Sequence, residues 1–287
     1  NADDYLTAEI ENTKEQSAVI VPKEYDLEIY PTINVLKYGN YTFRNISGKI
    51  DINEGIAQIE NGQSKLFDGK IKFDGKYDTS KDGAPFFDFK YNMDDLKFQE
   101  MFKKSESFKL LAPIAAFIEG IFNSTLIISG PLKTDMLPDL TKINASGFLE
   151  TVRGKITGFK PLEDLANTLK ISELAKMDIK DSKNWFDIKD GVVSIKPHDY
   201  SISDMSFTVG GSHSLDQTID YIIKAKIPRA KLKDANLGSA LEKGMSTLEE
   251  AASSRGVNLD LGENIFLDIY LTGSITKPKL KIIPIGS

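Results

Sequence analysis

Few residues of this chain have the types and spacing that catalysis or metal binding would need. Its two histidines, His198 and His213, fall in predicted loops or turns, and neither is near a group of His, Asp and Glu with metal-ligand spacing. A catalytic or metal centre requires several such side chains to converge on one point. We therefore expect both histidines to be ordinary exposed side chains, and we expect no metal site and no cofactor.

Two further patterns resemble functional motifs but are incomplete. The segment GGSHS at 210–214 is similar to a G-x-S-x-G nucleophile elbow, yet it lacks the last glycine and lies in a hairpin rather than a strand-to-helix turn. The carboxylates at Asp51 and in 181–191 precede glycines but do not complete a calcium loop with its terminal glutamate. No P-loop or dinucleotide fingerprint occurs. The sequence therefore predicts a protein that is not an enzyme and has no catalytic residues.

Composition narrows the range of partners. The 287 residues carry a formal net charge of −6 and give a pI of about 5.2, which argues against a broad phosphate-binding surface, so nucleic acid is not an expected partner. The absence of cysteine excludes disulfides and thiolate metal sites. The longest apolar run, 110–122, contains Glu119 and is shorter than the ~20 residues that span a bilayer. Because the chain begins at Asn1, we expect a processed form or fragment, with any membrane anchor outside it.

The elements that would position a site are mainly strands. From Tyr25 onward polar and apolar residues alternate, as in a sheet with one solvated face. Pairs of a polar residue with glycine then recur every six or seven residues, at Glu54-Gly55, Asn61-Gly62, Asp68-Gly69 and Asp74-Gly75. Such pairs favour hairpin turns, which predicts an antiparallel meander of strands of about five residues. Residues 1–24 are expected to form a peripheral strand and loop.

This pattern returns in the second half of the chain. Features that match at an offset of 136 positions are the turns Glu54-Gly55 and Asp190-Gly191, the glycines Gly75 and Gly211, and the strands Pro85–Tyr91 and Tyr221–Ile227. Nearer the C-terminus, Gly273 matches Gly130 at an offset of 143. We interpret the recurrence as an internal duplication. It predicts a single region built from two related halves, about 25–145 and 146–287.

Three segments predict amphipathic helices, which makes the fold class mainly β with α (α+β). The segments are 97–122, the stretch from Pro161 to Met177, and roughly Leu237 to Ser254. The first is apolar around most of its circumference. Two interpretations stay open: a core helix that covers the sheet, or a helix that lines an apolar groove for acyl chains. In the second case the candidate lipid contacts are Ile114, Phe117, Ile118, Ile121, Phe122, Leu126 and Ile128.

Several motifs in order then indicate a family. FKPLEDLANTLK, WFDIKDGVVSIKP, VGGSHSLDQTIDYIIKAKIP and LTGSITKPKL, together with KLLAPIAAFIEGIFNSTLIISGPLKTDMLPDL, resemble the C-terminal region of AsmA-family proteins of Gram-negative bacteria, most closely the Bacteroidetes type. The resemblance covers about Pro22 to Pro278. It implies an elongated, curved antiparallel sheet with an apolar inner groove, as in relatives such as TamB and the bridge-like lipid transfer proteins.

The resemblance also implies a function. It predicts the periplasmic region of an envelope protein, anchored to the inner or outer membrane in the full-length protein, that handles or transports phospholipid in outer-membrane biogenesis. Phospholipid or another acyl lipid, the membrane and other envelope proteins are then the expected partners. The alternative is a structural or interaction module that regulates assembly or targeting of outer-membrane proteins and binds no lipid.

Overall fold

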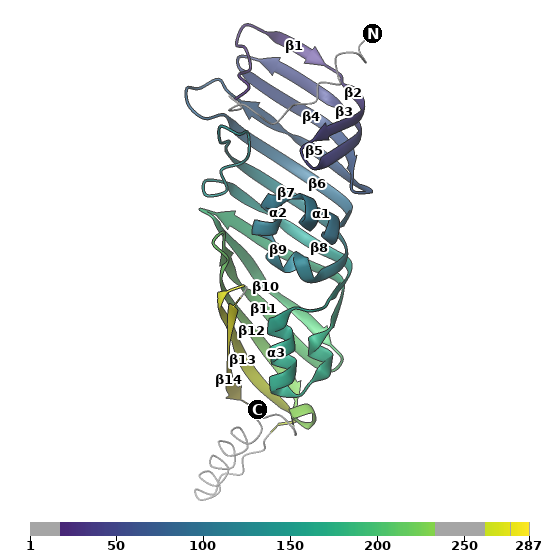
Figure 1. Ribbon diagram of the computed structural model, residues 1–287, viewed down its shortest axis with the longest axis vertical. Coiled ribbons are helices and arrows are strands. Elements are labelled where there is room, and N and C mark those ends of the chain that lie inside the picture. Colours follow the sequence, from purple (N-terminus) through teal and green to yellow (C-terminus); the bar gives the residue numbers. More distant parts are fainter. Residues whose placement is uncertain (1–17, 233–261, 276, 287) are drawn as a thin grey trace, which may run out of the picture.

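The computed structural model describes residues 18–232, 262–275 and 277–286. Within them the chain forms one long, open antiparallel sheet of 14 strands with three short α-helices (Figure 1). The prediction of a mainly β fold with helices is confirmed. The expected strand in 1–24 falls largely outside the described residues, as does the expected helix at 237–254, while 18–25 form no strand.

The elements follow one another in a simple order. The strands are β1 Asp26–Ile29, β2 Thr32–Tyr38, β3 Tyr41–Asn53, β4 Ile56–Leu66, β5 Gly69–Asp78, β6 Phe86–Lys97, β7 Ile118–Pro131, β8 Asn144–Ile156, β9 Met177–Lys189, β10 Val192–Ile202, β11 Met205–Ser214, β12 Thr218–Pro228, β13 Asn264–Ser274 and β14 Lys277–Gly286. The helices are α1 Phe98–Lys104, α2 Glu106–Leu111 and α3 Lys160–Leu169, with 3-10 turns η2 Pro113–Phe117, η3 Ser172–Ala175 and η4 Arg229–Leu232.

Each strand from β3 to β14 pairs with its neighbours in sequence, while β1 and β2 both pair with β3 at different ends of that strand. The two ends of the sheet are therefore formed by the two ends of the described chain (Figure 1). The last strand, β14, carries Pro278 and Pro284. Proline lacks an N–H group and is found on edge strands, which suits a strand that ends the sheet.

The strands are longer than predicted, since β3 to β14 have 10 to 14 residues each. Asn61-Gly62 and Asp74-Gly75 are not turns but lie inside β4 and β5. A Cβ atom on Gly62 would lie 2.5 Å from the ring of Phe73, and one on Gly75 would lie 2.6 Å from the ring of Phe89. These glycines make room for aromatic rings on the next strand, so a turn was the wrong interpretation.

The two halves share further features at the predicted offset of 136. The register of β4 on β5 shifts between Ile59 and Gly62, and that of β10 on β11 shifts between Ile195 and His198. Such bulges bend a strand and increase its twist. The equivalence proposed for Tyr221–Ile227 is wrong, however. Gly75 pairs with Phe89 while Gly211 pairs with Tyr221, an offset of 132 (221 − 89), because loop 79–85 is four residues longer than loop 215–217.

One face of the sheet, here called the inner face, is apolar and carries the helices. Along β1 to β6 the register aligns apolar side chains on it, for example Leu27 with Ile52, Ile50 with Ile59, and Phe73 with Tyr91. The opposite, outer face of β5 and β6 carries exposed charged residues such as Lys72 and Lys90. Alternation with period two produces these two faces.

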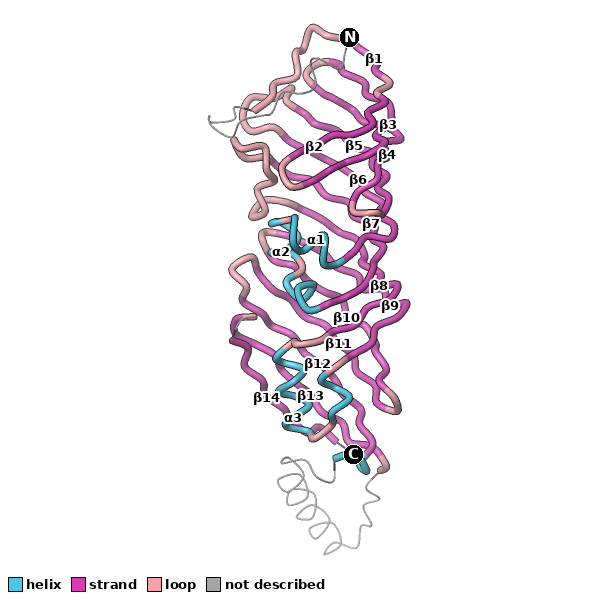
Figure 2. The backbone as a smooth tube through the Cα atoms, turned by 45° about the vertical axis from the view of Figure 1, so that its right-hand side comes forward, coloured by secondary structure: helices cyan, strands magenta, loops and turns pink. Residues whose placement is uncertain are grey.

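Three apolar clusters lie on the inner face. One lies beneath α3 and η3 on β11 to β13 and includes Leu169, Ile227 and Leu267; another lies beneath α1 and η2 and includes Leu96, Phe98 and Phe122. The third, called the middle cluster below, consists of Phe87, Ile128, Ile143, Ala145, Ile188 and Val193. Figure 2 shows the helices over the middle and C-terminal strands, and no described helix lies over β3 to β5.

The helix expected at 97–122 is wrong in its second part. It divides into α1, α2 and η2, and residues 118–131 form strand β7 instead. Pro113 begins the 3-10 turn η2, and from Ile118 onward the backbone pairs with both β6 and β8. Apolar residues on both sides of a central strand resemble a buried helix in periodicity, which explains the error.

The second predicted helix is confirmed as α3 but is shorter than expected. It begins at Lys160 with Pro161 in its first turn, and it ends at Leu169 because Lys170 adopts the left-handed conformation. Leu165, Ala166 and Leu169 are buried, as the apolar stripe predicts.

Candidate functional site

The described residues contain no group of three or more His, Cys, Asp or Glu side chains that could hold a metal ion. They also contain no helix long and apolar enough to cross a membrane.

The prediction that His213 is an exposed turn residue is wrong. It lies in β11 with 6% of its surface exposed. Its Nδ1 lies 2.8 Å from the Tyr221 hydroxyl, and its Nε2 lies 3.0 Å from the Leu111 carbonyl oxygen. Because a carbonyl only accepts, Nε2 carries the proton, and in the neutral ring Nδ1 accepts from Tyr221. Burial lowers the pKa of His213 from its ordinary value, against a smaller opposite effect of the Leu111 carbonyl.

His198 also lies in a strand, β10, and it belongs to a small polar network on the inner face. Its Nε2 lies 3.2 Å from Ser182 Oγ, which accepts a 3.2 Å hydrogen bond from the Asn184 amide, and Asn184 in turn accepts from the Tyr200 hydroxyl. No carboxylate hydrogen-bonds to His198 among the described residues. A serine and a histidine without a third orienting group do not make a catalytic triad, so the network satisfies polar groups within an apolar surface.

The larger feature is the part of the inner face on β1 to β6 that no described helix covers, called the uncovered surface below. Its apolar side chains are in mutual register and are only partly buried: Ile50, Ile52, Ile59, Phe73, Phe89 and Tyr91. At the end of the sheet, Leu27 and Ile29 are 45% and 41% exposed. Burial raises the pKa of Tyr91 to about 12, which marks its surroundings as apolar. A contiguous exposed apolar surface of this kind indicates a binding surface.

The seven candidate lipid contacts do not form one surface. Phe117 packs against Phe159 with 5.2 Å between ring centroids, Ile118, Phe122 and Ile128 are buried, and Ile121 pairs with Arg153 and Lys97 on the outer face. Ile114 in η2 is 38% exposed, and Leu126 is partly exposed beside Tyr91.

Ile118, Phe122 and Ile128 cannot reach a ligand in this conformation because they are buried. The apolar residues on β3 to β6 are not among the predicted lipid contacts, although the alternation of Ile50 and Ile52 with Lys49 and Asp51 places them on one face.

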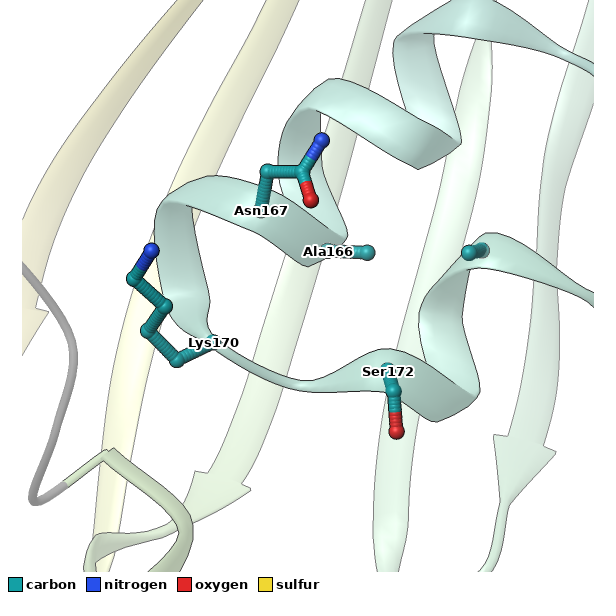
Figure 3. A pocket seen from close by; sticks show the side chains of 5 residues that line it. Ala166, Asn167, Lys170 and Ser172 are labelled. Atoms are coloured by element: carbon teal, nitrogen blue, oxygen red, sulfur yellow. The ribbon is translucent and has the colours of Figure 1, made fainter.

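Two depressions lie among the described residues. One, of about 330 Å³, lies between the end of α3 and η3 and is lined by Ala166, Asn167, Lys170, Ser172 and Ala175. Its labelled polar side chains point in different directions rather than toward one point (Figure 3). The other, of about 410 Å³, is lined by Lys97, Gln99, Glu119, Gly120, Ile121, Arg153, Gly154 and Lys155. Neither resembles an apolar ligand site.

No family model, no curated protein and no solved structure matches this chain. The resemblance to the AsmA family therefore stays a prediction from the motifs.

Proposed function

We propose that this chain is a non-enzymatic lipid-handling protein whose uncovered inner face on β3 to β6 accommodates acyl chains. One observation carries the proposal: the apolar face continues along the whole sheet, whereas the described helices cover only its middle and C-terminal parts. Following the resemblance to the AsmA family and its lipid-handling relatives, we place this activity in the periplasm, with phospholipid as the ligand and a membrane anchor elsewhere in the full-length protein.

The energetics favour a flexible apolar ligand. Each methylene group removed from water stabilises a complex by about 0.8 kcal/mol, so an acyl chain that follows several strands gains several kcal/mol. Neighbouring strands lie about 4.8 Å apart, so the three spacings from β3 to β6 give a surface about 14 Å across. The partly exposed rings of Phe73, Phe89 and Tyr91 supply an adaptable apolar floor.

The test uses two matched variants. Ile52→Glu places a charge on the uncovered inner face, and Ile127→Glu places the same charge on the outer face, where Ile127 is 50% exposed. Washed, folded protein is analysed by denaturing mass spectrometry for copurified phospholipid or fatty acid. We expect lipid in the wild type and in Ile127→Glu but little in Ile52→Glu. Absence of lipid from the wild type, together with failed photocrosslinking, would refute the proposal.

One observation favours the alternative, a module that contacts envelope proteins. Trp185 on the outer face is 48% exposed, packs against Phe148 at 5.2 Å between centroids, and has Lys183 above both rings. Exposed tryptophan is enriched in protein interfaces. If Trp185→Ala abolished an envelope phenotype while lipid content stayed intact, the interaction module would be the better assignment.

A further inference from the structure

One hydrogen bond across the inner face joins a helix of the first half to a strand of the second half. Helix α2 belongs to the connection between β6 and β7, yet its last residue, Leu111, reaches β11. There the His213 Nε2–H donates to the Leu111 carbonyl over 3.0 Å, between residues 102 positions apart. The Leu111 side chain packs on the middle cluster. Helix α2 therefore lies over the inner face with its last residue held beside β11.

The attachment of α2 is slight. None of its six residues is buried. The flanking residues Ser105 and Ala112 are not helical, so one non-helical residue separates α2 from α1 and another separates it from η2. Leu111 packs on the middle cluster, and the ring of Phe108 stacks on the ring of Phe122 with 5.8 Å between centroids. Segments with few buried contacts open locally at low free-energy cost.

We propose that α2 is a strap over the inner face, released at His213, and that its release joins the uncovered surface on β3 to β6 with the middle cluster into one apolar path. The strap regulates the lipid surface and in this respect rests on the proposed function; its fastening can be tested without lipid.

The path follows from the register. Tyr91 pairs with Leu126, which pairs with Gly147, and Gly147 pairs with Phe186 on β9. Phe186 then pairs with Ile195 on β10. These apolar side chains are partly exposed and pack around the middle cluster, where Leu111 also lies. Lifting Leu111 removes one of the side chains that cover the cluster and breaks no strand pair.

His213 can lose its hydrogen bond to Leu111 and keep its hydrogen bond to Tyr221. Its ring makes one hydrogen bond to the strap and one to Tyr221 on β12, so loss of the Leu111 contact leaves the ring anchored to the sheet. The titratable group that faces it is Tyr221, whose own pKa is raised, mainly by burial and further by Tyr200. Both groups are thus uncharged near neutral pH, and the fastening consists of one neutral hydrogen bond.

Two substitutions of His213 separate its two contacts. A glutamine amide reaches the position of Nε2, so His213→Gln keeps a donor for Leu111. An asparagine amide reaches only the position of Nδ1, so His213→Asn keeps the Tyr221 contact and loses the strap. Hydrogen exchange is followed in the peptide 105–117, with 219–227 on β12 as the internal control. Transfer of pyrene-labelled phosphatidylglycerol from phosphatidylethanolamine–phosphatidylglycerol vesicles is measured on the same proteins.

We expect His213→Asn to exchange about five-fold faster than wild type in 105–117, the effect of one net hydrogen bond, and to take up the pyrene lipid faster. His213→Gln should match wild type, and 219–227 should be unchanged in both. Wild-type exchange in His213→Asn would overturn the fastening, whereas faster exchange with unchanged lipid uptake would overturn the regulation.

If wild type takes up no lipid, the proposed function fails, while the exchange result still decides the fastening. Should His213→Asn fail to fold, Leu111→Ala removes the apolar anchor instead, and unchanged exchange in 105–117 would then contradict the strap.

Discussion

Replacing Phe122 by alanine tests whether this residue is core or ligand surface. Its side chain is 1% exposed and packs against Phe98 with 4.7 Å between ring centroids and against Phe108 with 5.8 Å. Truncation of a fully buried phenylalanine costs about 3–5 kcal/mol through lost transfer free energy and the cavity left behind. We therefore expect Phe122→Ala to lower the free energy of unfolding by about this amount.

Ile114→Ala is the matched control, because this second candidate lipid contact lies in η2 and is 38% exposed. Its loss should cost below about 1 kcal/mol. Urea unfolding followed by the fluorescence of the single tryptophan, Trp185 on the nearby strand β9, measures both free energies. A cost below about 1 kcal/mol for Phe122→Ala, or equal costs for both variants, would refute the core assignment.

Three further outcomes follow from the same structure. Burial lowers the pKa of His213 below its ordinary 6.5, so the folded state binds fewer protons at this residue than the unfolded state. The free energy of unfolding should be constant above pH 6.5 and fall on acidification through the lowered pKa. The fall should be less steep in His213→Gln, and urea titrations at several pH values measure it. Gly75→Ala and Gly211→Ala should each lower the free energy of unfolding by about 1–3 kcal/mol, because each new Cβ would lie against the next strand. An unchanged midpoint of thermal unfolding in either variant would show that the two glycines do not have the same role. Pro284→Val restores an edge N–H group and should increase self-association in analytical ultracentrifugation; an unchanged monomer fraction would show that this proline does not protect the edge.

Much of the sheet could be predicted because local chemistry decides it. The turns at Glu54-Gly55 and Asp190-Gly191 need positive φ at both residues, and the structure shows 49° and 81° in the first and 50° and 74° in the second. The strand on each side then follows from its alternation. Glycines that sit beneath aromatic rings, such as Gly75, carry the same local signal as turn glycines, because the partner ring is supplied by another strand.

The candidate site was less predictable because it depends on which strands the short helices cover. The run through Phe122 is apolar whether it forms a helix or a strand buried between two neighbours, and only pairing with β6 and β8 decides between them. Burial of His213 depends on a helix 102 positions earlier in the chain. The lengths and positions of the short helices decide which apolar residues no described helix covers. The periodicity within a strand gives no information about this.

The pairing of each strand with its sequence neighbours has a consequence for how the chain acquires its structure. From β3 onward no strand waits for a distant partner, so loop-closure costs stay small and the sheet can extend strand by strand as the polypeptide is delivered N-terminus first. Contacts between the covering segments and distant strands close afterwards, among them Leu111 on His213 and the α3 cluster on β13. A chain that folds from its N-terminus would thus form its sheet early and attach its covering helices last.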